Sequence, residues 1–168
     1  MKNTHMTYGF VTALVIIVVS VVLYVAGLAF KPGMQYITYL PFLIGVILNG
    51  VAFSNANNNY VTFGNVFSSC FKACAIITLV ILVWSFISLA IFPEMKDKAM
   101  EMAREKMAKN PNMTDEQIDM AINMTKKYFT LFMVMGVVFG YMIFGAIFSL
   151  IGAAIAKKKG PAAPVAQV

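Results

Sequence analysis

The chain has 168 residues, of which 60% are hydrophobic and only 12% are charged, and its mean hydropathy is +0.79. Soluble domains carry about 25% charged residues, so this composition excludes an ordinary soluble enzyme and a disordered chain. The formal net charge is +6, but the basic residues do not gather into one face, which argues against nucleic-acid binding. We therefore predict an all-α integral membrane protein.

Four apolar stretches are long enough to cross a bilayer core, which takes about 20 residues. The predicted transmembrane helices cover residues 8–30, 34–53, 66–92 and 128–156. The first is too long for the apolar part of a signal peptide and is interpreted as an uncleaved anchor. Pro41 predicts a kink in the second. Residues 1–159 thus form one four-helix transmembrane domain, and residues 160–168 are predicted to be a disordered tail.

Residues 93–127 form the one sizeable extramembrane element, and they contain all seven acidic residues of the chain. Pro93 favours the start of a helix, and the sequence Asn-Pro-Asn at 110–112 ends it. Thr114 and Gln117 then have the spacing of a capping box at the start of a second helix. We predict a two-helix hairpin between the third and fourth transmembrane helices.

The second helix of this hairpin has one apolar face. Met113 and Ile118 have the spacing of a hydrophobic staple, and Ile122 lies one turn further along. Such a face packs either on the membrane surface or on the first helix of the hairpin. Met113, Ile118 and Ile122 are therefore candidates for packing or for contact with another membrane or envelope protein.

No residue pattern in the chain predicts catalysis or a bound cofactor. The only histidine is His5, and the predicted transmembrane helices contain no Asp, Glu, His or Arg. Cys70 and Cys74 lie one helical turn apart, a spacing that fits a disulfide poorly, and they are interpreted as small packing residues. The 13 methionines allow Cu(I) binding as an alternative, but they form no tight cluster with His or Cys. We predict no enzyme activity, no cofactor and no metal.

Two polar residues stand out in the apolar stretches. Lys72 directly precedes the third long uncharged run. Its ammonium group either extends to the membrane interface or contacts a lipid phosphate or a partner. Asn49 lies within the second transmembrane helix, where an interhelical hydrogen bond is the favoured role.

The fourth transmembrane helix carries small residues four positions apart, which allow helix backbones to approach closely. These residues are Gly136, Gly140, Gly145 and Ser149. Packing within one bundle is the favoured interpretation, and homodimerisation is the alternative.

Charge counts leave the orientation open. With four transmembrane helices the termini share one side, which carries the basic residues Lys2, Lys72, Lys157, Lys158 and Lys159, whereas the opposite side carries eight. The larger number favours a cytoplasmic hairpin by the positive-inside rule. The lysine triplet directly after the fourth transmembrane helix favours the reverse.

The layout resembles the bacterial domain-of-unknown-function family 4199. The segments that carry the resemblance are residues 60–72, 92–94, 113–118 and 126–129. The resemblance implies a small multi-pass protein of the bacterial inner membrane, and it supplies no catalytic residues. Relatives tend to have a basic loop between the second and third transmembrane helices, which implies cytoplasmic termini; this chain instead has an Asn-rich loop there. On this basis we expect the termini inside and the hairpin outside.

The sequence leaves two functions to compare. The first is a non-enzymatic accessory or interaction protein that presents the 93–127 hairpin. The second is a small transporter or channel component, acting as a homo-oligomer, whose polar path would have to be lined by Asn49 and scattered hydroxyl side chains. Those hydroxyl residues are Thr12, Ser20, Thr78, Ser85, Ser88 and Ser149.

Overall fold

The structure, a computed structural model, describes residues 1–31 and 33–160. Pro32 and residues 161–168, most of the predicted tail, lie outside the described residues. The regular structure of the described part is helical: α1 (His5–Val25), the 3-10 helix η1 (Met34–Thr38), α2 (Tyr39–Ala56), α3 (Phe63–Ile91), α4 (Glu94–Ala108), α5 (Asp115–Lys127) and α6 (Phe129–Ile155). Helices α1, α2 with η1, α3 and α6 are long and apolar enough to cross a membrane. This confirms the predicted all-helical class with four candidate transmembrane helices.

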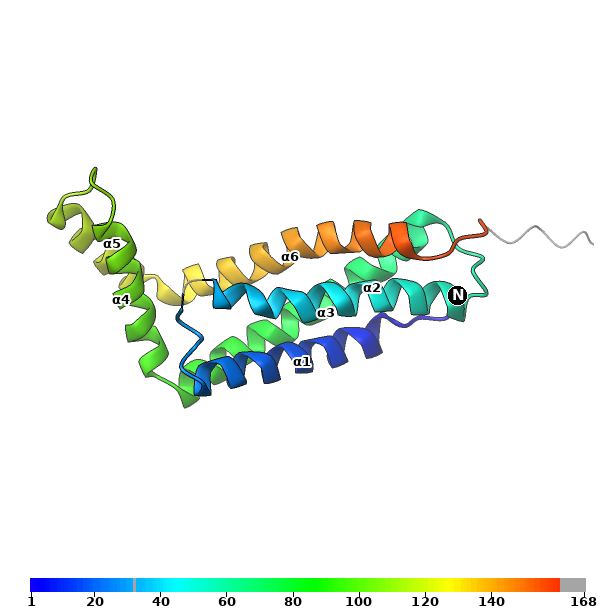
Figure 1. Ribbon diagram of the computed structural model, residues 1–168, viewed down its shortest axis with the longest axis horizontal. Coiled ribbons are helices and arrows are strands. Elements are labelled where there is room, and N and C mark those ends of the chain that lie inside the picture. The colour runs from blue at the N-terminus through cyan, green and yellow to red at the C-terminus, as the bar shows by residue number, and fades with distance from the viewer. Residues whose placement is uncertain (32, 161–168) are drawn as a thin grey trace, which may run out of the picture.

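The four long helices run side by side along the long axis of the molecule (Figure 1). Helix α3 contacts α6 and α1, and α2 contacts the same two helices as well as α3. Helices α4 and α5 lie across one end of this bundle, whereas the N-terminus and the end of α6 lie at the other (Figure 1). We call these the α4–α5 end and the terminal end.

Helix α1 ends at Val25, five residues before the predicted limit, because a glycine motif stops it. Gly27 has a φ of 67°, a left-handed conformation that glycine adopts without strain. Its N–H donates to the carbonyl of Tyr24 at 2.9 Å, and the N–H of Leu28 donates to the carbonyl of Leu23 at 2.8 Å. This is the hydrogen-bond pattern of a Schellman motif.

Pro41 does not lie in a helix interior, as the predicted kink required. Residues 34–38 form the separate 3-10 helix η1, and α2 begins at Tyr39. Pro41 therefore lies in the first turn of α2, where a missing N–H costs no intrahelical hydrogen bond.

Helix α3 has 29 residues, which corresponds to about 43 Å and exceeds the roughly 30 Å of a bilayer core. It begins at Phe63, three residues before the predicted start, because Thr62 and Asn65 form a capping box. The N–H of Asn65 donates to Thr62 Oγ1 at 3.2 Å, and the N–H of Thr62 donates to Asn65 Oδ1 at 3.0 Å.

Candidate functional site

Asn49 lies at the centre of a hydrogen-bonded cluster near the terminal end of the bundle. Its amide is fully buried. Asn49 Oδ1 accepts a hydrogen bond from Thr4 Oγ1 at 2.7 Å, and its Nδ2 donates to Ser69 Oγ at 3.3 Å. The structure thus places Asn49 in hydrogen bonds that join the segment before α1 to α2 and α3.

The small residues of α6 divide into two groups. Gly145 and Ser149 are buried against α3: a Cβ on Gly145 would lie 2.9 Å from Cβ of Cys74, and Ser149 Oγ lies 3.6 Å from Cys74 Sγ. Gly136 is exposed, and a Cβ there would meet nothing within 4 Å; one on Gly140 would lie 3.6 Å from the hydroxyl of Tyr39. Gly145 and Ser149 therefore set the distance between α3 and α6, whereas Gly136 and Gly140 do not.

Lys72 is exposed on α3. The 20 residues from Lys72 to Ile91 correspond to about 30 Å of helix, the thickness of a bilayer core. The nine residues of α3 before Lys72 extend toward the terminal end. This geometry is compatible with an ammonium group at a membrane interface.

The apolar face of the second hairpin helix is turned inward. Ile118 and Ile122 are only 3% and 7% exposed, Met113 is half-buried, and Met100 of α4 is buried as well. Helices α4 and α5 contact each other, and Arg104 and Asp119 join them in an ion pair of 2.6 Å. In the structure, α5 thus lies against α4 and also contacts α6.

The opposite face of α5 carries two exposed methionines. Met120 is 69% exposed and Met124 is 56% exposed. They lie four residues apart and therefore side by side on the helix surface. They are the large apolar side chains that the α4–α5 pair leaves accessible in the described part of the chain.

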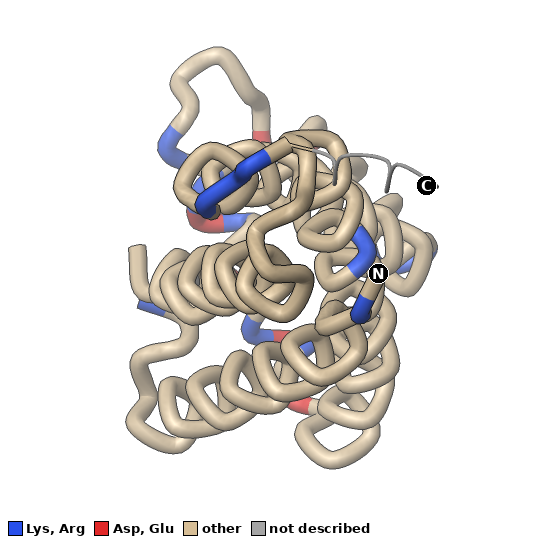
Figure 2. The backbone as a smooth tube through the Cα atoms, turned by 90° about the vertical axis from the view of Figure 1, so that its right-hand side faces the viewer, with Lys and Arg blue, Asp and Glu red and all other residues tan. Residues whose placement is uncertain are grey.

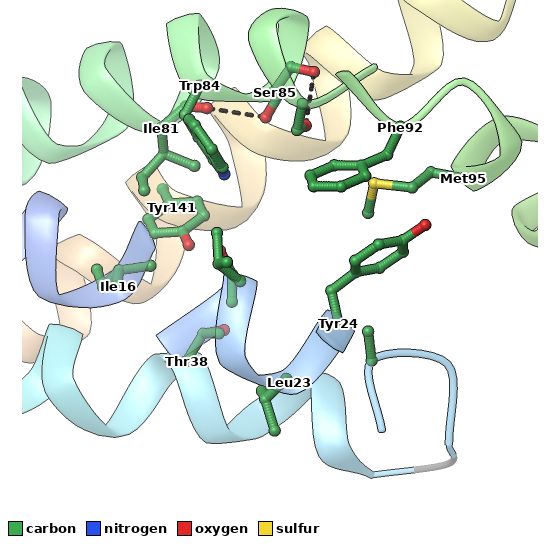
Figure 3. A pocket seen from close by; sticks show the side chains of 14 residues that line it. Ile16, Leu23, Tyr24, Thr38, Ile81, Trp84, Ser85, Phe92, Met95 and Tyr141 are labelled. Atoms are coloured by element: carbon green, nitrogen blue, oxygen red, sulfur yellow. Dashed lines mark hydrogen bonds between the residues drawn. The ribbon is translucent and has the colours of Figure 1, made fainter. Parts of the chain in front are cut away.

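A cavity of about 290 Å³ lies near the α4–α5 end of the bundle (Figure 3). Its lining comes from α1, η1, α3, α6 and the first turn of α4. The lining residues are Ile16, Ser20, Val21, Leu23, Tyr24, Ala29, Thr38, Ile81, Trp84, Ser85, Ser88, Phe92, Met95 and Tyr141. The lining is aromatic and aliphatic, with hydroxyl groups and no charged side chain.

A contact between α1 and α4 lies beside this cavity. The hydroxyl of Tyr24 donates a hydrogen bond to the carboxylate of Glu94, and the rings of Tyr24 and Phe92 lie 4.6 Å apart between centroids. The hydrogen bond from Tyr24, together with the positive charge of Lys98, lowers the pKa of Glu94 below its usual value. Glu94 therefore stays ionised at neutral pH and fixes the start of α4 next to the cavity.

The family model described as "Protein of unknown function (DUF4199)" matches residues 7–158, which is nearly the whole chain. The chain belongs to the DUF4199 family. The resemblance found in the sequence is thereby confirmed. Comparisons of this DUF4199 chain with curated proteins and with solved structures gave no match.

Sequence reasoning did not find the cavity of this DUF4199 chain. Its residues are spread over five elements, and each looks like an ordinary interior residue of an apolar helix. The sequence indicates Ser20, Ser85 and Ser88 only as candidates to line a polar path. One available signal was Trp84, the single tryptophan of the chain, which lies in the interior of a long helix and not near an end, where interfacial tryptophans gather.

Proposed function

We propose that this DUF4199 protein is a non-enzymatic multi-pass protein of the bacterial inner membrane, and that its α4–α5 pair binds another membrane or envelope protein. The observation that carries the proposal is the outward-facing pair Met120 and Met124, on a helix whose other apolar face is already buried. Methionine side chains adapt to irregular partner surfaces. Helices α4 and α5 would thus form a folded binding unit attached to the four transmembrane helices.

The absence of enzyme activity is part of this proposal. All seven acidic residues fall within residues 94–119 and are exposed. His5 stands at the start of α1, at the opposite end of the molecule from these acids (Figure 1). General acid–base catalysis needs such groups within hydrogen-bond reach of one substrate, and this separation argues against it.

We also propose that the termini lie in the cytoplasm. The lysine triplet directly follows α6, and Lys158 Nζ donates to the carbonyl oxygen of Ala153 at 2.6 Å. The terminal end carries only basic formal charges in its described side chains; Figure 2 looks onto this end and marks the lysine beside the N-terminus. Positive residues close to transmembrane helix ends favour the cytoplasmic side.

Cysteine labelling tests this orientation, because both native cysteines are buried. Asn112→Cys places a thiol in the exposed loop between α4 and α5, and Asn55→Cys places one near the terminal end. In spheroplasts, a membrane-impermeant maleimide should label Asn112→Cys at once and Asn55→Cys only after the membrane is opened. The reverse pattern would overturn the proposed orientation, and labelling of both before lysis would mean that α3 does not cross the membrane.

Site-specific photocrosslinking tests the partner. A photoreactive amino acid at Met120 should give one discrete adduct with a second protein in cells, whereas the same amino acid at Leu150, which is exposed on α6, should not. The Met120→Gln, Met124→Gln double variant should insert normally, and a photoreactive residue at neighbouring Asn123 should then lose the adduct. The absence of a discrete adduct from Met120, or the same adduct from Leu150, would refute partner binding by this face.

The polar residues that the transport alternative requires fall into two groups in the structure. Thr12, Asn49, Thr78 and Ser149 are buried in packed positions, and every buried side-chain N or O atom of the described part has a hydrogen-bond partner. Thr78 Oγ1, for example, donates to the carbonyl of Cys74 at 2.8 Å. These four residues pack helices together. The other three, Ser20, Ser85 and Ser88, line the cavity near the α4–α5 end, so the two groups do not form one continuous path.

A further inference from the structure

The cavity near the α4–α5 end has the size of a small ligand site. Its volume is about 290 Å³, and an apolar cavity of about 150 Å³ is enough to bind benzene. One six-membered ring with substituents therefore fits. The lining supplies flat partners for such a ring, because Tyr24, Trp84, Phe92 and Tyr141 all contribute to it (Figure 3).

Three serine hydroxyl groups of the cavity are free to accept hydrogen bonds. Ser20 Oγ donates to the carbonyl of Ile17 at 2.7 Å, Ser85 Oγ to that of Ile81 at 2.8 Å, and Ser88 Oγ to that of Ser85 at 3.0 Å. Each hydroxyl has one proton, so these three oxygens retain only acceptor capacity. A ligand that pairs with them must bring an O–H or N–H group.

Trp84 provides the complementary donor. Its indole nitrogen points into the cavity in Figure 3, and the described residues give it no hydrogen-bond acceptor. A ligand oxygen at this place would accept the indole N–H. The head of the ligand therefore both donates and accepts, as a hydroxyl group on a ring does.

The charges around the cavity favour an uncharged head. The lining, which belongs entirely to the described residues, contains no Lys, Arg, Asp or Glu. Burial of an isolated charge without a partner is strongly unfavourable.

A second, apolar hollow lies along α1 and α3. It has a volume of about 490 Å³, and Met6, Phe10 and Ile17 of α1 and Ile76, Leu79 and Val83 of α3 contribute to its lining. Trp84 contributes to the lining of both spaces, so they lie next to each other. An aliphatic chain attached to a ring in the cavity would lie in this groove.

We propose that the protein binds one molecule of an uncharged, ring-headed membrane lipid of the quinol class, with the ring between Tyr24 and Trp84 and the tail in the α1–α3 groove. Ser20, Ser85 and Ser88 accept from its hydroxyl groups, and Trp84 donates to one of its oxygens. The oxidised quinone form offers no donor to the serines and binds more weakly. The proposal concerns binding, and no electron transfer is part of it. It relies on membrane insertion and not on a partner at α4–α5.

The single tryptophan makes binding directly measurable. The full-length protein in lipid nanodiscs should show saturable, one-to-one quenching of Trp84 fluorescence by decylubiquinone, and the reduced form should displace the oxidised form because it supplies donors to the serines. Ser88→Leu, which fills the cavity, should weaken binding at least tenfold. Ala90→Leu, on the exposed face of the same helix, should bind like the wild type.

Ser85→Ala adds no bulk and keeps the test valid if Ser88→Leu fails to fold. Loss of one neutral hydrogen bond should weaken binding of the reduced form by about two- to tenfold.

Quenching that is linear in quinone concentration and equal in all variants reflects free quinone in the bilayer and would overturn the proposal. Displacement by 1-decanol as effective as that by the reduced quinone would refute the recognition of a ring. A loss of partner crosslinking at Met120 would leave this binding unchanged, so the two proposals fail separately.

Discussion

Replacing Gly45 with alanine should destabilise the helix bundle by about 1–3 kcal/mol, the usual cost of overpacking an interior. Gly45 on α2 is buried against Thr12 on α1, and a Cβ built there would overlap the Thr12 side chain and lie 2.8 Å from its Cβ. The two helices would have to move apart. Equilibrium unfolding in mixed micelles measures the free energy of unfolding of this variant against the wild type.

Two further variants separate overpacking from helix propensity. Gly136→Ala is the matched control, because its added Cβ meets nothing within 4 Å, and alanine is the better helix former; it should leave the stability unchanged or raise it slightly. Thr12→Gly removes the atoms that Gly45→Ala meets, so the double variant should be more stable than the sum of the two single changes predicts. Full stability of Gly45→Ala would mean that α1 and α2 do not approach at this point.

The predictable part of the fold depends on local signals. Four long apolar runs separated by charges fixed the number of long helices, since a run of that length has few alternatives. The capping box at Thr114 was also predictable, and the structure has it: the N–H of Gln117 donates to Thr114 Oγ1 at 3.3 Å. A capping box involves residues of a single helical turn, so it can be predicted without knowing which helices lie nearby.

Helix ends that depend on backbone conformation were harder to predict. The early end of α1 requires Gly27 to adopt a positive φ, and many glycines in apolar helices, such as Gly145, instead serve close packing. The 3-10 helix before Pro41 has no residue pattern that separates it from the start of an α-helix. The sequence alone could not decide between these roles, because tertiary contacts select among them.

The candidate site was less predictable than the fold for the same reason. The lining of the cavity is a relation between α1, η1, α3, α4 and α6, and the three serines look identical to serines in any apolar helix. Each serine hydroxyl donates a hydrogen bond to a carbonyl three or four residues earlier, as serine often does in helices. Only the arrangement of the helices brings the three serine oxygens to the lining of the same cavity.

Replacing Ile118 with alanine should unfold the α4–α5 pair and leave the four long helices intact. Ile118 is almost fully buried, and truncation of such a side chain costs about 2–5 kcal/mol. The pair has few other buried apolar side chains, Ile122 and Met100 being the main ones. A loss of this size should therefore exceed its local stability, while the packing of α3 on α6 does not depend on it.

Hydrogen exchange followed by mass spectrometry should detect this local unfolding as a loss of amide protection in residues 94–127, with unchanged protection in α3. Met120→Ala is the matched control, since Met120 lies exposed on the same helix and its truncation should leave exchange unchanged. The two variants also separate structure from recognition: both should lose the partner, Ile118→Ala through unfolding and Met120→Ala through the contact alone. Loss of the partner by Ile118→Ala with normal amide protection would mean that the Ile118 face itself contacts the partner and that α4 covers it only in the unbound protein.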